Sequence, residues 1–375
     1  MNRIYSYIFK EPAYNRKELY HSLRKLTDIF IENKSENYFD KEKNIYSYLY
    51  YFYPQNMYKS LFIFDELNRT KFFHKFRNRP INIADIGAGL SPSIMSLFVF
   101  LHKEKLTLNR LNINLVEKSS TALKHAKDLL TVGKKLYSIR NAHIYYNKTS
   151  LKRFIENVGD NQYDLIILSN SYKEFIKDSE DLSFINEIST ALTEDGVLVL
   201  IEPGTKSDSL ALIRLRNYIL SKGKLSLFSP CLGSENCKLA EQNSEWCHVT
   251  RGWEPPELTK DLGNMLKRDY KTVKFSYLIF VKKRLTLINY IDKHYNHEKS
   301  WNIFTELKKE KGKIVVKGCR DGVITVFEML DKNRSELNRD FLKLISHNYM
   351  CIENYTILKN GNIRVESDTK VKIIY

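Results

Sequence analysis

The chain has five cysteines in 375 residues, and three of them, Cys231, Cys237 and Cys247, fall in one short stretch. A fourth, Cys319, lies further along in a Lys-Gly-Cys-Arg-Asp-Gly turn. Three cysteines at loop spacing in an intracellular type of sequence indicate metal ligands more readily than disulfides. Four thiolates suit zinc or an iron–sulfur cluster. The cysteines therefore predict a metal or iron–sulfur centre.

Two neighbouring observations bear on this centre. His248 directly follows Cys247 and is a candidate zinc ligand. Free cysteines are often small buried hydrophobic residues, which is what we expect of Cys351 in its Met-Cys-Ile run. The clustered cysteines could be buried in the same way without a metal, and this is the alternative to a metal centre.

A short glycine-rich loop follows the first predicted strand and reads Asp85-Ile-Gly87-Ala-Gly89. Glycines at 87 and 89 allow a sharp turn and the close approach of a ligand. Ser91 and Pro92 then predict the start of a helix, with Ser91 as its N-cap. The alternative is a tight strand–helix turn that binds nothing.

The second predicted strand ends in Glu117, where a carboxylate can accept hydrogen bonds from both hydroxyls of a ribose. The third glycine of the dinucleotide fingerprint is missing, since position 92 is proline. S-adenosylmethionine has no pyrophosphate, so a shorter loop suffices, and Asp85 can orient the ligand or the loop. The loop and Glu117 predict an S-adenosylmethionine site rather than an NAD site.

Polar residues also follow the next two strands. The fourth strand ends in a Ser-Asn170-Ser-Tyr172 turn, and the fifth ends at Glu202. Ligands of parallel sheets bind at the carboxyl ends of the strands. We therefore expect Asn170 and Glu202 to face the cofactor and Tyr172 to contact cofactor or substrate, with a ligand-free polar loop as the alternative. The sequence shows no persuasive general base or nucleophile nearby.

Hydrophobic patterns divide the chain into three regions. A helical N-terminal domain is predicted over residues 1–75, where Leu19, Leu23 and Leu26 recur at helical spacing. Residues 76–283 are predicted to form an α/β domain with a Cys-rich insertion at 228–268. Residues 284–375 are predicted to form a small β-barrel-like domain, with a hairpin turn at Asn360-Gly361.

Within the α/β domain, short apolar strands alternate with helices, which predicts a parallel, doubly wound sheet. The predicted strands are 81–86, 112–117, 143–146, 164–169 and 196–202. The predicted helices between and after them are 92–103, 121–131, 151–158, 182–192 and 209–221. A last strand pair, 224–228 and 272–281, is expected to surround the Cys-rich insertion.

The formal net charge of +16 and a pI near 9.3 favour anionic partners, chiefly nucleic acid. Aromatic side chains interleave with the basic ones, as in many proteins that bind single-stranded RNA. The alternative is an ordinary solvated Lys-rich surface. The basic face that we expect comprises Arg214, Arg216, Arg251, Lys313, Lys317 and Arg320.

The sequence has no apolar run long enough to span a bilayer. Glu11, Glu18 and Asp28 give the N-terminus more acidic residues than transit peptides have, and a signal-peptide core is missing. We expect a soluble, intracellular protein that works as a monomer away from membranes.

Several motifs together resemble a known family, the methyltransferase-like assembly factors of the small ribosomal subunit in mitochondria and bacteria. The resemblance runs in the family's order over about residues 45 to 330. Besides the glycine loop, the matching segments are Glu202-Pro-Gly-Thr205, Ser229-Pro-Cys231, Trp246-Cys-His248, Lys274-Phe-Ser-Tyr-Leu278 and Gly318-Cys-Arg320. The chain departs from the family in having Glu-Asn-Cys-Lys around Cys237, and it is poorly matched after Arg334.

The resemblance implies a class I methyltransferase core, a helical N-terminal part and a small C-terminal β domain. It also implies a [4Fe–4S] cluster on four ligands, Cys231, Cys237, Cys247 and Cys319, with zinc as the alternative from residue types alone. Family members act on the small ribosomal subunit and its rRNA, so the expected compartment is the bacterial cytoplasm or the mitochondrial matrix.

The combined interpretation is a cluster-bearing, S-adenosylmethionine-binding protein that acts on small-subunit rRNA during ribosome assembly. The first alternative is a non-catalytic RNA-binding assembly factor, which the missing catalytic pair favours. The second is a zinc-stabilised methyltransferase of another substrate, against which the basic charge speaks. Whether the chain methylates anything is open at this point.

Overall fold

The computed structural model describes residues 1–10, 14–32, 38–172, 182, 184–233, 236–240, 245–283, 287, 289, 296–320 and 322–374. By compactness, the chain forms two units: Met1–Ile201 with Gly252–Val273, and Glu202–Arg251 with Lys274–Tyr375. The sequence-predicted boundaries at 75/76 and 283/284 follow sequence pattern and stay a prediction. None of the helices in the described part of the chain combines the length and apolarity needed to cross a membrane.

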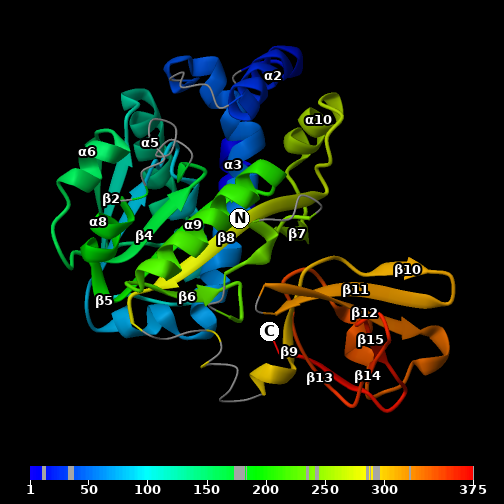
Figure 1. Cartoon of the computed structure of the whole chain (residues 1–375). Helices are drawn as coiled ribbons and strands as arrows, with labels where there is room; N and C mark the ends of the chain where they lie inside the picture. The colour runs from blue at the N-terminus through cyan, green and yellow to red at the C-terminus, as the bar shows by residue number, and fades with distance from the viewer. Residues whose placement is uncertain are drawn as a thin grey trace. The chain divides into compact units, whose positions relative to one another are not determined.

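The N-terminal part of the first unit is helical, as predicted. Its helices, drawn in dark blue to light blue in Figure 1, are α1 (Asn2–Ile8), α2 (Arg16–Glu32), η1 (Tyr38–Asp40), α3 (Glu42–Arg69) and η2 (Phe72–Arg77). Leu19, Leu23 and Leu26 are all fully buried, which explains their helical spacing. This helical part packs on the α/β core through contacts between α3 and α4 (Pro92–Lys103).

Five parallel strands form the core of the first unit. They are β1 (Ile81–Ile86), β2 (Leu111–Glu117), β3 (Ala142–Lys148), β4 (Tyr163–Ser169) and β5 (Leu192–Pro203). Their order in the sheet is β3-β2-β1-β4-β5. The order reverses beside β1, which makes the carboxyl ends of β1 and β4 the switch point where such sheets bind ligands. The predicted doubly wound α/β fold with a parallel sheet is confirmed.

The crossover helices of this unit lie close to their predicted positions. They are α4, α5 (Ser120–Leu136), α6 (Leu151–Glu156) and α8 (Phe184–Ala191), and α10 (Glu257–Met265) belongs to the second segment of the unit. No helix was predicted at the position of α10. The helix α10 packs on α3 through a buried hydrogen bond from Thr259 Oγ1 to the Tyr50 carbonyl oxygen.

The second unit begins with α9 (Lys206–Lys222), followed by β6 (Ser226–Ser229), η3 (Lys238–Ala240) and β7 (Val249–Gly252). The strand β8 (Thr272–Val281) pairs antiparallel with β6, and β7 also pairs with β8. The predicted strand pair around the Cys-rich segment is thereby confirmed.

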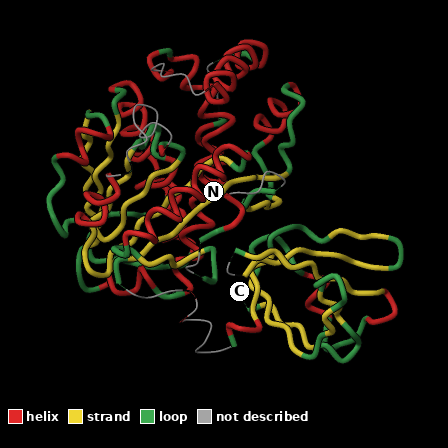
Figure 2. The backbone as a smooth tube through the Cα atoms, in the orientation of Figure 1, coloured by secondary structure: helices red, strands yellow, loops and turns green. Residues whose placement is uncertain are grey.

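The C-terminal residues form a curled sheet, visible as orange and red strands in Figure 1 and as yellow strands in Figure 2. Its strand order is β14-β15-β12-β11-β9-β13-β16, with β10 paired to β11. The strands are β9 (Ser300–Ile303), β10 (Lys308–Glu310), β11 (Lys313–Arg320), β12 (Val323–Leu330), β13 (Tyr349–Glu353), β14 (Thr356–Ile357), β15 (Ile363–Val365) and β16 (Lys370–Ile373). Three short 3-10 helices, η4 (His297–Lys299), η5 (Asp331–Asn333) and η6 (Arg339–Lys343), connect them.

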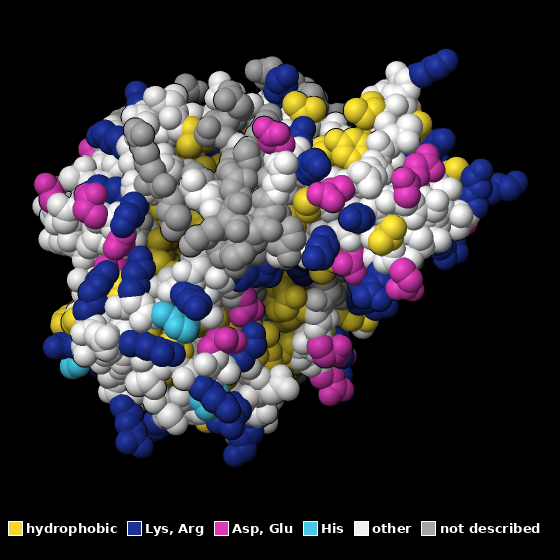
Figure 3. Space-filling view, turned by 90° about the horizontal axis from the view of Figure 1, so that it is seen from below, with side chains coloured by type: hydrophobic (Ala, Val, Ile, Leu, Met, Phe, Trp, Pro, Cys, Tyr) yellow, Lys and Arg dark blue, Asp and Glu magenta, His cyan; other side chains and the backbone are white. Residues whose placement is uncertain are grey.

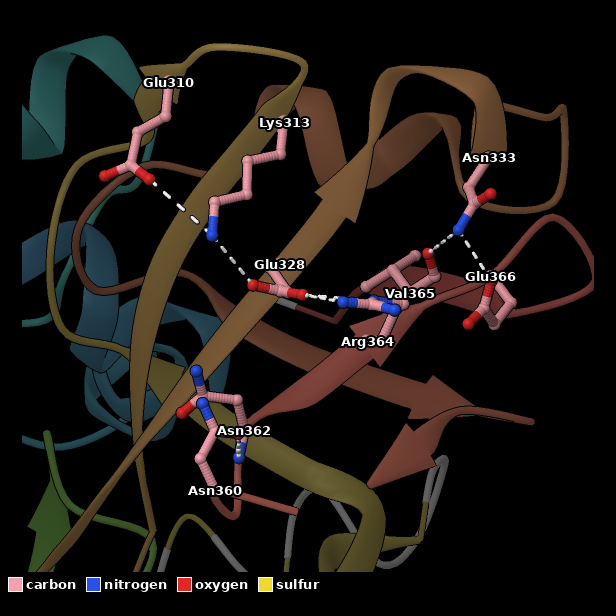
Figure 4. A network of polar contacts seen from close by, with 9 residues as sticks. All are labelled: Glu310, Lys313, Glu328, Asn333, Asn360, Asn362, Arg364, Val365 and Glu366. Carbon is pink, nitrogen blue, oxygen red and sulfur yellow. Dashed lines mark hydrogen bonds and ion pairs between the residues drawn. The ribbon is translucent and has the colours of Figure 1, made fainter. Parts of the chain in front are cut away.

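The predicted turn at Asn360-Gly361 joins β14 to β15, with Gly361 at a positive φ of 80°. A polar network fixes the strands beside it (Figure 4). Glu328, nearly buried on β12, accepts hydrogen bonds from Lys313 Nζ at 3.0 Å and Arg364 Nε at 3.1 Å. This buried carboxylate neutralises two basic side chains of the domain, and those pairs lower its pKa.

Candidate cofactor loop and four-cysteine site

The glycine loop in the first unit is tightly packed at the end of β1. The main-chain N–H groups of Gly87 and Ala88 both donate to the Val116 carbonyl oxygen, at 2.9 and 3.0 Å. Gly87 has a φ of +72°, and a Cβ built on it would lie 2.5 Å from Ser171 Cβ. Only glycine fits this position, because both the backbone conformation and the space exclude a side chain.

Glu117 lies against the same loop from the end of β2. Its carboxylate accepts a hydrogen bond from the Gly89 N–H at 3.0 Å and another from the Ser119 N–H at 2.9 Å. Ser119 in turn caps α5 by accepting from the Ala122 N–H at 3.2 Å. The acidic side chain is thus held at the glycine loop by main-chain donors, at the strand end where a ribose would be recognised.

Asp85 is buried below the loop, with 2% of its surface exposed. Burial, and to a lesser degree the charge of Glu117, raises the pKa of the Asp85 carboxyl to about 7. Ser91 Oγ donates to Asp85 Oδ2 at 3.3 Å. Ser91 is the N-cap residue of α4, as predicted, with Pro92 in the first turn. Its side chain makes no capping hydrogen bond, because Ser91 has a left-handed φ of 58° and its hydroxyl bonds Asp85 instead.

Aromatic residues from the N-terminal helices cover the loop, which the sequence did not reveal. A Cβ on Gly89 would lie 3.3 Å from Phe39 Cε2. The rings of Phe39 and Tyr48 meet edge to face with their centres 5.2 Å apart. The Tyr48 hydroxyl accepts from Asn56 Nδ2 at 2.9 Å, and burial raises the pKa of Tyr48. Because the charges of Asp85 and Glu117 add to that shift, Tyr48 lies near both carboxyls.

Asn170 follows β4, the strand next to β1. It has a positive φ of 55°, its N–H donates to the Ile201 carbonyl oxygen at 2.7 Å, and its Oδ1 accepts from Lys59 Nζ at 3.4 Å. Lys59, on α3, is 7% exposed and also donates to Asn56 Oδ1 at 2.9 Å. Lys59 is a site residue that sequence reasoning missed, since it looked like one more surface lysine.

The other two predicted residues of this region are buried as well. Tyr172 is buried and packs against Phe184, with ring centres 6.4 Å apart. Glu202 is buried at the end of β5 and belongs to the second unit. The structure therefore brings Asp85, the glycine loop and Glu117 together, and the cofactor role of all six residues named from the sequence stays a prediction.

The four predicted cysteines line one small cavity of about 40 Å³ inside the second unit. Cys231 follows β6, Cys237 precedes η3, Cys247 precedes β7, and Cys319 lies on β11. Residues separated by more than eighty positions in sequence thus converge, and all five cysteines are free thiols. The fifth, Cys351, is buried on β13, as expected of a structural cysteine.

Close packing fixes the two segments that carry these thiols. Gly322, at a φ of +73°, lies against the Cys237 loop, because a Cβ there would be 3.1 Å from the Asn236 carbonyl oxygen and 3.2 Å from Cys237 Cα. On the other side, the Pro230 carbonyl oxygen accepts from Asn302 Nδ2 at 2.7 Å and from the Tyr349 hydroxyl at 2.8 Å.

The pKa values of the thiols in this cavity depend on their burial and on the nearby guanidinium of Arg216. Burial raises the pKa of the Cys319 thiol to about 12 and the pKa of Cys247 well above its ordinary range, with further contributions from the neighbouring thiols. The guanidinium of Arg216, which is 2% exposed, lowers both. Within the described residues, no group of three or more His, Cys, Asp or Glu side chains has the arrangement of a formed metal site. The thiols share a cavity without standing in coordination positions.

Two histidines also line the cavity. His248 hydrogen-bonds the Trp246 carbonyl oxygen through Nδ1 at 3.0 Å, and burial lowers its pKa. His347 is fully enclosed, and burial lowers its pKa to about 3, so its ring is neutral. Ser346 Oγ lies 3.0 Å from its Nδ1. Sequence reasoning missed His347, because it lies far in sequence from Cys231, Cys237 and Cys247 and in no motif with Cys319.

The basic face expected from the sequence is wrong in its composition. Arg216 is buried in the thiol cavity rather than exposed. Lys317 pairs with Glu245, and Lys313 pairs with Glu328. Arg320 stacks on the Trp301 ring at 4.3 Å. The six basic residues therefore do not form one free surface, because Arg216 is buried and three of the others already have local partners.

Several solved structures match part of this chain at low identity. An rRNA methylase from Streptococcus thermophilus is 10% identical, with a TM-score of 0.29, over 58% of this chain and 95% of that one. Precorrin-6y C5,15-methyltransferase from Geobacter metallireducens is 15% identical, with a TM-score of 0.33, over 57% and 87%. Spermidine synthase from Thermotoga maritima is 13% identical, with a TM-score of 0.32, over 63% and 65%.

No curated protein matches the chain. A family model does: the family described as mitochondrial small ribosomal subunit Rsm22 matches residues 70–334. The match spans the glycine loop, the motifs from Glu202 to Leu278 and all four clustered cysteines, so the resemblance expected from the sequence is confirmed. Because most of the chain is matched, it belongs to the Rsm22 family.

Proposed function

We propose that this chain is an S-adenosylmethionine-binding, metal-containing protein that acts on the rRNA of the small ribosomal subunit. The observation that carries the cofactor part is the placement of two acidic side chains, Asp85 and Glu117, around the Gly87–Gly89 loop at the switch point of the sheet. Family membership supports the link to the small ribosomal subunit. The family's description also supports the mitochondrial matrix over the bacterial cytoplasm as the compartment.

In this proposal Glu117 recognises the two ribose hydroxyls, while Gly87 and Gly89 let the ligand approach the main chain. Asp85 orients the loop, and Asn170 and Glu202 face the cofactor. The residues fit such a ligand: two main-chain N–H groups already hold the Glu117 carboxylate at the loop. The cofactor, when bound, supplies a methyl group on a positively charged sulfur.

Calorimetry with S-adenosylmethionine and S-adenosylhomocysteine tests this part. Glu117→Ala should weaken binding by about 1.5–3 kcal/mol, because two ribose hydroxyls lose their charged acceptor. Asp65→Ala, which removes a partly exposed carboxylate on α3, is the control and should bind like the wild type. Equal affinities of the wild type and the Glu117 variant would show that the loop has a purely structural role.

In the metal part of the proposal, a [4Fe–4S] cluster is bound by four ligands, Cys231, Cys237, Cys247 and Cys319. The alternative is a zinc ion bound by the same four cysteines. Donor chemistry fits, since four thiols and a buried cation line one cavity. The bound metal would fasten together the two chain segments that supply the thiols. Anaerobically purified protein should be brown and contain about four irons per chain. Colourless protein with one zinc would replace the cluster by a tetrahedral zinc site.

A non-catalytic role in RNA binding is the second candidate, and one observation favours it. The Asn170 amide oxygen, at the carboxyl end of β4, accepts a hydrogen bond from Lys59. A side chain engaged in this way is less available to a bound ligand. The third candidate, a zinc-stabilised methyltransferase of another substrate, agrees less well with a net charge of +16.

The net charge of +16 supports the RNA-binding part of the proposal. Lys and Arg side chains are dispersed over the face seen in Figure 3, among fewer acidic ones. In the described structure, Lys309 and Lys311 are exposed on the β10–β11 hairpin and are better candidates for phosphate contacts than the six basic residues expected from the sequence. Each phosphate contact releases counterions, so binding should weaken steeply with salt.

Filter binding to small-subunit rRNA over a salt series tests this surface. Lys309→Glu with Lys311→Glu should lower affinity for all RNA sequences alike and flatten the salt dependence. Lys124→Glu with Lys135→Glu on α5 makes the same change of net charge elsewhere and is the matched control. If both double variants lose affinity equally, the effect is one of overall charge and the hairpin is not the contact surface. Sedimentation of the wild type would also test the predicted monomer.

A further inference from the structure

Arg216 occupies a position on α9 that is normally apolar. It lies four residues after Leu212 and three before Ile219, and all three side chains are buried. Arg214, two residues earlier on the same helix, is exposed. A guanidinium on the buried stripe of a helix is rarely tolerated, because removing its charge from water costs several kcal/mol unless anions or strong acceptors receive it. Its surroundings therefore need an explanation.

The contacts of the guanidinium all point to the cysteine-bearing loop. Arg216 Nη2 donates to the Gly233 carbonyl oxygen at 2.8 Å, and Nη1 donates to Asn217 Oδ1 at 2.9 Å. A further hydrogen bond reaches the Cys231 thiol. Asn217 Oδ1 also accepts the Cys237 N–H at 3.0 Å, so two of the cysteines are tied to this pair of helix residues.

The side chains beside Arg216 that could carry a negative charge are the thiols. Cys231, Cys237 and Cys319, once ionised, each attract the guanidinium. The planar guanidinium can donate to several acceptors at once, and its charge persists at any working pH. Four thiolates around a zinc ion, or around an oxidised four-iron cluster, leave a net charge of about −2. A centre of that charge in a buried cavity is stabilised by a cation at its edge.

We propose that Arg216 is a positioning residue that serves as the built-in counter-cation of an anionic metal–thiolate centre on the four cysteines. Asn217 supports this role by holding both the guanidinium and the Cys237 main chain. The inference rests on the proposed metal centre and adds a reason why a metal would be held there. The alternative is that Arg216 only holds the cysteine-bearing loop through hydrogen bonds to neutral acceptors. In that case the positive charge of Arg216 would have no influence on metal affinity.

Metal-free, full-length protein titrated anaerobically with Co²⁺ tests the inference, because cobalt–thiolate bonds give a charge-transfer absorption that reports binding directly. Arg216→Met should weaken Co²⁺ binding at least tenfold. Arg216→Lys should weaken it less, because lysine keeps the positive charge but cannot donate to several acceptors at once as the planar guanidinium does. Arg214→Met removes an exposed arginine from the same helix and should leave Co²⁺ affinity unchanged. Circular dichroism establishes that each variant is folded.

A second variant separates charge from packing. Asn217→Asp keeps an oxygen that accepts from both Arg216 and the Cys237 N–H, but its carboxylate cancels the charge of Arg216. It should weaken Co²⁺ binding by several-fold or more. If Asn217→Asp and Arg216→Lys both bind Co²⁺ like the wild type, the counter-cation role is refuted, even where Arg216→Met fails to fold.

The outcomes also distinguish this inference from the metal proposal. Wild-type protein that gives no cobalt–thiolate absorption would overturn the metal centre and the counter-cation role together. Tight binding by the wild type, with unchanged affinity in the Arg216 and Asn217 variants, would overturn only the role of Arg216.

Discussion

The buried carboxyl of Asp85 makes a quantitative prediction about stability and pH. Its pKa is raised from 3.8 to about 7 in the folded chain, chiefly by burial. Between these two values the unfolded chain has lost the proton and the folded chain still holds it. The folded state binds more protons in this window, so stability falls as pH rises and levels off above pH 7. A shift of this size corresponds to about 4 kcal/mol, of which about 2–3 kcal/mol is lost between pH 5 and pH 8.

Asp85→Asn removes the titration while keeping a polar side chain of the same shape. The unfolding free energies of both proteins are measured in urea at pH 5 and at pH 8. The value for the variant minus the value for the wild type should be about 2–3 kcal/mol larger at pH 8 than at pH 5. Asp65→Asn, at a partly exposed position on α3, is the control and should show no such change. If the difference between wild type and Asp85→Asn is the same at both pH values, Asp85 is already ionised in the folded chain at pH 5 and burial does not raise its pKa.

Three further predictions concern the loops of both sites. Gly87→Ala should lower stability by about 2–4 kcal/mol and abolish cofactor binding, whereas Gly361→Ala, with a similar φ but open space, should cost only about 1–2 kcal/mol in thermal melts. Gly322→Ala should reduce bound metal, measured by elemental analysis, because its Cβ would push on the Cys237 loop; Gly312→Ala, also at positive φ but unobstructed, should keep the metal. Cys319→Ser should lose metal and Cys351→Ser should retain it, and equal metal content in these two variants would contradict the predicted ligand set.

The regular elements could be predicted from the sequence because local patterns determine them. Buried strands such as β1 and β8 begin and end at the predicted residues, since each is a short apolar run bounded by turn residues or charges. The glycine loop was recognisable for the same reason: Gly87 is required by the backbone itself. Cys319 was grouped with the other cysteines by family resemblance, and the structure does bring it into their cavity.

Residues whose role depends on distant partners were not predictable in this way. Phe39 and Tyr48 belong to an aromatic-rich helical region in which nothing local indicates that the Phe39 ring reaches Gly89 and that the Tyr48 ring packs against it. Arg216 did carry a signal, since it interrupts an apolar stripe at helical spacing, but the net charge of the chain made every arginine look like surface. A basic residue at a core position of a helix is better interpreted as a buried partner than as part of an RNA-binding face.

The two sides of the four-cysteine cavity are held differently, and this determines what a metal would contribute. The Cys231 side is fixed without metal, because the preceding Pro230 carbonyl oxygen accepts hydrogen bonds from both Asn302 and Tyr349. The Cys237 side depends on contact with Gly322 and on the Asn217 side chain. Metal loss should therefore loosen the Cys237 loop while the Cys231 segment stays attached to the C-terminal sheet.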